Sequence, residues 1–168
     1  MKIREAVQND LSSILTIYNE GIEDRIATLE ADKKDLHYMN DWFSQRQSRY
    51  KVLVAEQEGK LVGWASLNPY NAREAYIGVA DLSIYIARSH RGRGVGAQLL
   101  EKIEQQAIEH HFHKIVIFTF VFNELGQRLY RKSGYREVGV FKNQGILGGK
   151  YVDVMAMEKL LKSKEEFK

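Results

Sequence analysis

The sequence has no cysteine and only one proline among its 168 residues. The lack of cysteine excludes disulfide bonds, thiolate metal sites and a cysteine nucleophile. With so little proline, long helices and strands can run uninterrupted. No apolar run approaches the ~20 residues that a membrane-spanning helix needs, and the polar start of the chain lacks the apolar core of a signal peptide. We therefore expect a cytoplasmic protein with no membrane partner.

The charge balance is only mildly basic, with 25 Lys and Arg against 22 Asp and Glu and a formal net charge of +3. So small a surplus does not indicate a nucleic-acid-binding protein. The composition, 44% hydrophobic and 28% charged, is that of a globular protein. No repeat, low-complexity tract or linker divides the chain. We expect a single domain over residues 1–161 and a frayed tail over 162–168.

The spacing of apolar residues predicts a mixture of strands and helices. Two helices are expected early, after residue 10 and near residues 36–43, and two later ones over 94–110 and 124–133. The predicted strands cover residues 2–7, 52–55, 61–65, 80–87, 114–120, 135–141 and 151–157. The glycines from Gly145 to Gly149 predict a flexible hairpin between the last two strands. This order predicts an α/β sandwich, since a doubly wound fold would alternate strictly.

One glycine-rich segment, Arg91-Gly92-Arg93-Gly94-Val95-Gly96, joins a predicted strand to a predicted helix. Glycine has no Cβ, so ligand oxygens can approach its backbone closely. The start of the helix offers unpaired N–H groups and a partial positive charge. Arg91 and Arg93 add cations suited to phosphate. The segment therefore predicts a binding site for a diphosphate.

Other interpretations of this segment fit less well. A Walker loop ends in Gly-Lys-Ser/Thr, whereas Gly96 is followed by Ala97-Gln98. A dinucleotide-binding fingerprint would accept Ala97 at its third glycine, but no acidic residue ends a following strand at the required distance. A basic surface loop remains the plain structural alternative.

The segment 91–96 resembles the Arg/Gln-x-x-Gly-x-Gly/Ala signature of the GNAT acetyltransferases, which bind the pyrophosphate of acetyl-CoA. Further along, Asn123, Gly126, Tyr130 and Gly134-Tyr135 resemble the Asn-x2-Ala-x3-Tyr-x3-Gly-Phe helix of the same family. Shorter segments resemble the phosphinothricin N-acetyltransferase group, which also acts on methionine sulfoximine and methionine sulfone: residues 17–19, 49–50, 54–56, 72–76 and 80–86.

This resemblance implies a mixed, mostly antiparallel sheet of about seven strands with about four helices, splayed between the fourth and fifth strands. It also implies acetyl-CoA as cofactor and, usually, a homodimer. The backbone N–H groups freed by the splay would stabilise the negative charge on the thioester oxygen. The residues expected to bind acetyl-CoA are Ile84, Tyr85, Ile86, Arg91, Gly92, Arg93, Gly94, Val95, Gly96, Ala97, Asn123 and Tyr130.

The resemblance also implies catalytic roles. Tyr130 occupies the place of the tyrosine that protonates the departing thiolate, although phosphinothricin enzymes often have histidine there; a tyrosine that only packs under the sheet is the alternative. Asp81 occupies the place of a glutamate that acts as general base through water. It is one methylene shorter, so Glu30 or Glu74 could serve instead, and Asp81 could be a strand-edge carboxylate without a catalytic role.

The substrate residues are inferred from charge. An amino acid substrate carries a carboxylate, which arginine matches with two hydrogen bonds. Arg73 with Tyr76 forms the first candidate pair and Arg25 comes next, although solvated surface positions explain them equally well. The group 110–113 contains three histidines, but it falls where a helix ends and a strand begins, so we expect no metal site.

We therefore predict an enzyme that transfers acetyl directly from acetyl-CoA to the amine of a small amino acid-like substrate. The loops at 25–31 and 68–78 favour a closed pocket for a small molecule. Two alternatives remain open at this point. One is an N-acetyltransferase that acts on proteins or peptides, and the other is a non-catalytic sensor that binds acyl-CoA.

Overall fold

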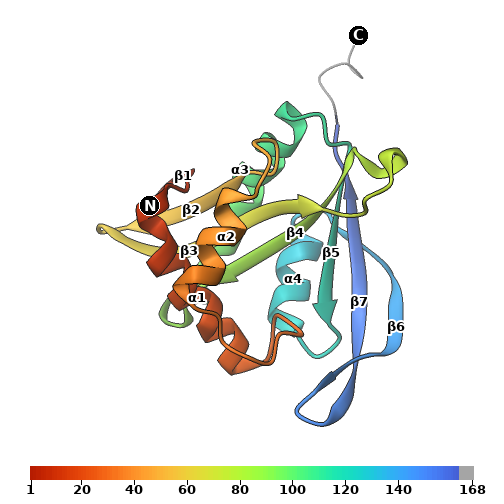
Figure 1. Ribbon diagram of the computed structural model, residues 1–168. Coiled ribbons are helices and arrows are strands. Elements are labelled where there is room, and N and C mark those ends of the chain that lie inside the picture. The colour runs from red at the N-terminus through yellow and green to blue at the C-terminus, as the bar shows by residue number, and fades with distance from the viewer. Residues whose placement is uncertain (163–168) are drawn as a thin grey trace.

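The computed structural model describes residues 1–162, and within them seven strands form one sheet of order β1-β2-β3-β4-β5-β7-β6 (Figure 1). The strands are β1 (Lys2–Glu5), β2 (Val52–Gln57), β3 (Lys60–Pro69), β4 (Val79–Ile86), β5 (Lys114–Phe120), β6 (Arg136–Leu147) and β7 (Lys150–Leu160). The helices are α1 (Leu11–Asp24), α2 (Leu36–Ser44), α3 (Val95–Glu109) and α4 (Glu124–Lys132), with short 3-10 turns at Gln8–Asp10, Glu74–Tyr76 and Arg88–His90.

This architecture confirms the predicted order of elements and the mixed sheet of about seven strands and four helices. Of the tail predicted for 162–168, residues 163–168 lie outside the described part of the chain. No helix within residues 1–162 combines the length and the apolar character required to cross a membrane.

Helices cover the two faces of the sheet unequally. Alternate residues of a strand point to opposite faces, so on β2 Leu53 contributes to the core beneath α3, whereas Val54 contributes to the core beneath α1 and α2. Figure 1 shows α1 and α2 over the half of the sheet formed by β1 to β4. The same face of β5, β7 and β6 therefore has no covering from these two helices.

The fourth and fifth strands separate soon after they meet. They run parallel and pair only from Val79 to Asp81 on β4 and from Lys114 to Val116 on β5. Within the described residues no pairing continues beyond this point, although β4 extends to Ile86 and β5 to Phe120. The predicted splay between these strands is confirmed. It leaves a wedge between them and an edge of β4 without a strand partner.

The last hairpin differs from its prediction. We expected a flexible segment over 145–149, but β6 runs to Leu147 and pairs with β7 through Gly145, Ile146 and Leu147. Only Gly148 and Gly149 form the turn, with φ of 59° and 76°. A two-residue hairpin turn of this kind needs a positive φ at both positions, and glycine adopts it without strain. The glycine pair thus allows a tight turn, so the predicted hairpin is present but its loop is shorter than expected.

Lys159 on β7 connects α3 and α4 to the sheet. Its Nζ donates to Oε2 of Glu104 on α3 at 2.8 Å and to the carbonyl oxygen of Ser133, directly after α4, at 2.7 Å. The Glu104 side chain is only 14% exposed. Because α4 carries Asn123 at its N-cap and Tyr130 on its buried side, this bridge fixes the position of both residues.

We expect Lys159→Met to lower the free energy of unfolding by about 2 kcal/mol, because Glu104 would remain buried without its cation. Urea denaturation measures this loss. The matched control is Lys142→Met, since Lys142 pairs with Asp153 at 3.2 Å while its own side chain is 80% exposed. This surface pair should contribute less than about 1 kcal/mol. Equal losses in the two variants would contradict the role assigned to Lys159.

Candidate active site

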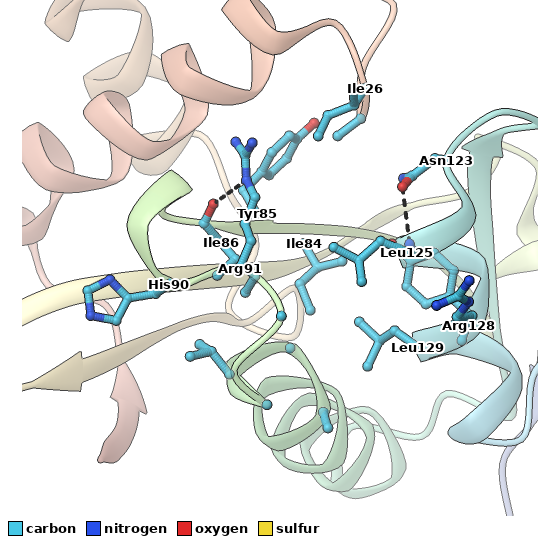
Figure 2. Close-up of a pocket in the computed structure, with 18 of the residues that line it drawn as sticks. Ile26, Ile84, Tyr85, Ile86, His90, Arg91, Asn123, Leu125, Arg128 and Leu129 are labelled. Carbon is cyan, nitrogen blue, oxygen red and sulfur yellow. Dashed lines mark hydrogen bonds between the residues drawn. The ribbon is translucent and has the colours of Figure 1, made fainter.

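A cavity of about 630 Å³ lies between the end of β4, the loop that follows it, and α4 (Figure 2). Its volume is within the range of small-molecule and cofactor sites. Its walls include every residue that the resemblance assigned to acetyl-CoA except Arg93. They also include Gly126 of the helix motif and several residues that the sequence did not indicate, namely Gly21, Ile26, Ala27, His90, Leu125, Arg128, Leu129, Arg131 and Lys132.

The glycine-rich loop forms one wall of this cavity. Gly92 has φ of 73°, and Gly94, the N-cap residue of α3, has φ of 84°. A Cβ added at either glycine would meet no atom within 4 Å. The backbone conformation, rather than lack of space, therefore requires glycine there. With this geometry the unpaired N–H groups of the first turn of α3 border the cavity, as binding of a diphosphate needs.

The two arginines of the loop, predicted to bind phosphate, do not both face the cavity as free cations. Arg91 borders the cavity, but its Nη1 pairs with Oδ2 of Asp24 at 2.6 Å and its Nε donates to the carbonyl oxygen of Ile86 at 3.3 Å. The guanidinium of Arg88 also pairs with Asp24, at 2.9 Å, and together the two arginines lower the pKa of this carboxyl. These contacts attach the loop to the end of α1. Arg93 lies outside the cavity lining.

The positive charge that faces the loop comes mainly from α4. Arg128, Arg131 and Lys132 line the cavity from this helix, and Figure 2 shows the side chain of Arg128 on the α4 side. Cations that line the same cavity as a helix N-terminus suit the phosphates of a nucleotide cofactor. The sequence analysis missed these residues, although their spacing along the predicted helix would have been the signal.

Asn123 and Tyr130 belong to α4 and serve different purposes. The Oδ1 of Asn123 accepts a hydrogen bond from the backbone N–H of Gly126 at 3.1 Å (Figure 2), and its Nδ2 donates to the hydroxyl of Thr119 at 3.2 Å. Asn123 thus caps the helix and ties it to β5. Tyr130 is 7% exposed, and burial raises its pKa to about 12. Its phenol is therefore protonated at neutral pH and is able to donate a proton.

A second cavity, of about 190 Å³, lies on the other side of the splay. Asp81 and Ser83 of β4 line it together with Phe118 of β5. Its other walls are formed by Ala27, Thr28, Leu29, Leu82, Tyr85, Thr119, Phe120 and Val154. Ala27 and Tyr85 line both cavities. The two cavities therefore adjoin where β4 and β5 diverge, which is the arrangement required for group transfer between two bound molecules.

Of the three acidic candidates, only Asp81 lines a cavity. Burial raises its pKa to about 6, and a side-chain hydrogen bond with Asn68 opposes this rise. A carboxylate with this pKa is mostly ionised at neutral pH and still basic enough to accept a proton. Glu30 instead pairs with Lys34 at 2.9 Å, and Glu74 lies in the 3-10 turn before β4.

The predicted substrate residues line neither cavity. Arg25 directly follows α1, and its guanidinium lies against Gly148, where an added Cβ would be 2.5 Å from its Nη1. Tyr76 packs edge-on against Tyr70, with ring centroids 5.7 Å apart. The backbone N–H of Arg73 donates to Asn71 within an exposed loop. Phe118 and Thr28 line the second cavity instead, and the sequence analysis had not assigned either to a site.

We expect Gly94→Ala to weaken acetyl-CoA binding about tenfold, because an L-residue with φ near 84° costs ~1–2 kcal/mol. The loop would relax and move its N–H groups away from the phosphates. Isothermal titration calorimetry with CoA measures the change. Gly59→Ala is the matched control, since Gly59 has φ of 75°, has no atom within 4 Å of an added Cβ, and lies in the distant β2–β3 turn. An equal loss of affinity in both variants would contradict the assignment.

Solved structures of acetyltransferases have the same fold. The chain is similar to a ribosomal-protein-alanine N-acetyltransferase from Brucella melitensis, with a TM-score of 0.93 and 33% identity over 96% of this chain and 100% of that one. It is also similar to a GNAT superfamily phosphinothricin acetyltransferase from Sinorhizobium meliloti, solved in complex with AcCoA. That comparison has a TM-score of 0.91 and 28% identity, covering 98% of this chain and 90% of the other.

Sequence comparison leads to the same group of enzymes. An L-methionine sulfoximine/L-methionine sulfone acetyltransferase of Pseudomonas aeruginosa is 30% identical over 158 residues, which cover 93% of this chain and 92% of that protein. The model of the acetyltransferase (GNAT) family matches residues 13–135, a stretch that includes β4, the glycine-rich loop and α4. The chain therefore belongs to the GNAT acetyltransferase family and is an acyltransferase that uses acetyl-CoA.

Proposed function

We propose that this enzyme transfers acetyl directly from acetyl-CoA to the amine of a small amino acid-like acceptor of the methionine sulfoximine, methionine sulfone or phosphinothricin type. The observation that carries the proposal is the junction of the two cavities at Tyr85, with Asp81 on one side and Tyr130 on the other. A volume of about 190 Å³ suits a small acceptor. The names of the relatives from Pseudomonas aeruginosa and Sinorhizobium meliloti support the same acceptor class.

The chain provides a group for each of the three steps of the reaction: removal of a proton from the amine, stabilisation of the oxyanion and protonation of the thiolate. Asp81 removes a proton from the acceptor ammonium, directly or through one water, so that the amine nitrogen can form the new bond to the acetyl carbon. N–H groups at the unpaired edge of β4 stabilise the negative charge on the thioester oxygen. Tyr130 donates a proton to the thiolate as the carbon–sulfur bond breaks, and the second proton lost by the acceptor nitrogen restores the phenol of Tyr130. Acetyl-CoA supplies the activated acyl group.

Release of CoA thiol tests this function, and because the protein has no cysteine every thiol detected is CoA. The acceptors are methionine sulfoximine, methionine sulfone, phosphinothricin, a polyamine and a peptide with an N-terminal alanine. We expect release with the first three. In Asp81→Asn the rate should fall by about 100-fold or more, and in Tyr130→Phe by about tenfold. In the unchanged enzyme, kcat/KM should fall as the pH drops below about 6, because Asp81 becomes protonated.

The control for this experiment is Glu74→Gln, which removes an acidic candidate outside both cavities and should keep full activity. Release with the peptide alone would contradict a small acceptor and indicate protein N-acetylation instead. The name of the Brucella melitensis neighbour describes that activity for that enzyme. Tight binding of acetyl-CoA without release on any amine would contradict the enzyme–acceptor proposal and favour a sensor.

We further propose that the enzyme is a homodimer formed through the face of β5, β7 and β6 that α1 and α2 leave uncovered. Phe118 on β5 and Phe141 on β6 are 42% and 47% exposed there, with ring centroids 6.5 Å apart. The register of β7 with its two neighbours places Ala156 and Val154 on this same face, where both are already buried within the chain. Exposed aromatic side chains that adjoin in this way are typical of protein–protein contacts.

We expect the unchanged protein to sediment with twice the chain mass and Phe141→Glu to sediment as a monomer, because a buried carboxylate without a partner opposes association. Analytical ultracentrifugation measures both masses. Tyr151→Glu is the control, since Tyr151 precedes Val152 on β7 and points to the opposite face of the hairpin. A monomeric unchanged protein, or dissociation by both variants, would contradict this interface.

A further inference from the structure

A half-buried arginine, Arg46, contacts β3, the strand that pairs with β4 and places Asn68 opposite Asp81. Arg46 follows α2, and its guanidinium stacks on the ring of Trp42 at 4.5 Å. Its Nε donates to the carbonyl oxygen of Tyr50 at 3.3 Å, and its Nη2 donates to the carbonyl oxygen of Leu67 and, at 3.2 Å, to Oδ1 of Asn68. Within residues 1–162 these carbonyl and amide oxygens, rather than a carboxylate, are its hydrogen-bond acceptors.

Arg46 keeps its charge although it is half-buried. Desolvation lowers its pKa to about 10, so the guanidinium is still protonated at neutral pH. Burial of an arginine without a carboxylate partner is unfavourable, because amide oxygens only partly replace water around the charge. The contact of Arg46 with Asn68 offers a functional reason for placing a cation at this position.

Asn68 is the residue directly opposite Asp81 in the antiparallel pair of β3 and β4. Residues paired in this way have their side chains on the same face, within contact distance. The Nδ2 of Asn68 donates to the hydroxyl of Ser83 at 3.1 Å and to the carbonyl oxygen of Ser66 at 3.4 Å, and the Asn68 amide lowers the pKa of Asp81, which lies opposite it. Its Oδ1 accepts from Arg46 and, at 3.1 Å, from the hydroxyl of Ser66.

Arg46 determines which end of the Asn68 amide faces β4. A guanidinium only donates hydrogen bonds, so the amide must present its oxygen to Arg46. The amide NH2 group then points toward β4, where it donates to Ser83 and faces Asp81. With the opposite orientation, Oδ1 would lie against the Asp81 carboxylate, and two acceptors would face each other.

We propose that Asn68 is a positioning residue that holds the Asp81 carboxylate toward the acceptor amine, and that Arg46 fixes the Asn68 amide in the orientation that allows this. The inference rests on the proposed function, since it takes Asp81 as the general base. It adds two residues, neither of which lines either of the two adjoining cavities. The short side chain of aspartate has few rotamers, and one donor from β3 is enough to select among them.

The same contact keeps Asp81 ionised. A donor to the carboxylate stabilises its charged form and so lowers its pKa, against the rise caused by burial. From β4 itself Tyr85 is coupled to Asp81, but burial raises the pKa of this tyrosine far above neutral pH and leaves it uncharged. On the same face of the sheet, Glu158 of β7 is already paired with Lys114 of β5 and with Arg136. Asn68, held by Arg46, is therefore the donor that faces Asp81 from β3.

The test compares pH profiles of kcat/KM in the complete enzyme with methionine sulfoximine as acceptor. We expect Asn68→Leu to raise the acidic pKa of the profile from about 6 by roughly one unit and to lower kcat about tenfold at neutral pH. Arg46→Met should cause a smaller shift in the same direction. The affinity for CoA should not change in either variant. Asn40→Ala, which removes an amide from the outer side of α2, is the matched control and should leave the profile unchanged.

Two further measurements separate this inference from the proposed function. A carbon-detected NMR titration of Asp81 without acceptor should show the same upward shift in Asn68→Leu, whether or not Asp81 is the base. In an Asp81→Asn background, Asn68→Leu should cause no additional loss of rate. If the acidic limb persists in Asp81→Asn, the proposed base is wrong.

An unchanged acidic limb and an unchanged Asp81 titration in folded Asn68→Leu would overturn the role of Asn68. Circular dichroism and urea denaturation establish whether the variant is folded. Should Asn68→Leu fail to fold, Asn68→Ala removes the same amide with a smaller side chain, and the same two measurements decide the question.

Discussion

The early separation of β4 from β5 is the constraint on which the rest of the site depends. Three residue pairs hold the two strands together, and beyond Asp81 and Val116 each strand continues without the other. A sheet edge with unpaired N–H groups is normally unfavourable inside a protein. Here the helices on either side of the sheet keep the wedge open, because α3 and α4 pack on one face and α1 and α2 on the other. The same backbone groups that lack a strand partner are those that a thioester and its amide-containing arm can use.

The position of α4 determines which side chains border the opening between β4 and β5. The helix is capped by Asn123, tied to β5 through Thr119, and held at its other end by Lys159. Its cationic side chains and Tyr130 thereby border the cavity that the glycine-rich loop closes. The loop in turn is attached to α1 through Asp24. The segment that follows α1 contributes Ala27 to both cavities, so the elements that bind the cofactor and those that enclose the acceptor form one connected structure.

Local signals in the sequence were sufficient for much of this arrangement. The apolar run of β5, the periodicity of α3 and the glycines of the loop each involve neighbouring residues, and their elements and the strand splay agree with the structure. The contact of Arg46 with Asn68, 22 residues apart, depends instead on where a helix ends and how β3 is registered against β4. No local pattern indicates such a contact. The lining of the acceptor cavity by Phe118 and Thr28 likewise depends on the packing of a long connecting segment against a distant strand.

Burial of Asp81 links the chemistry of this site to the stability of the whole molecule. Its carboxyl has a pKa of about 6 in the folded chain and an ordinary value of 3.8, so between these two pH values the folded state binds more protons than the unfolded state. The contribution of Asp81 to the free energy of unfolding is therefore largest below pH 3.8 and is lost as the pH rises through about 6. The charged form, which the reaction needs, is therefore the form that favours folding less. At neutral pH Asp81 is mostly ionised and able to accept a proton, and its contribution to the free energy of unfolding is lower there than at acidic pH.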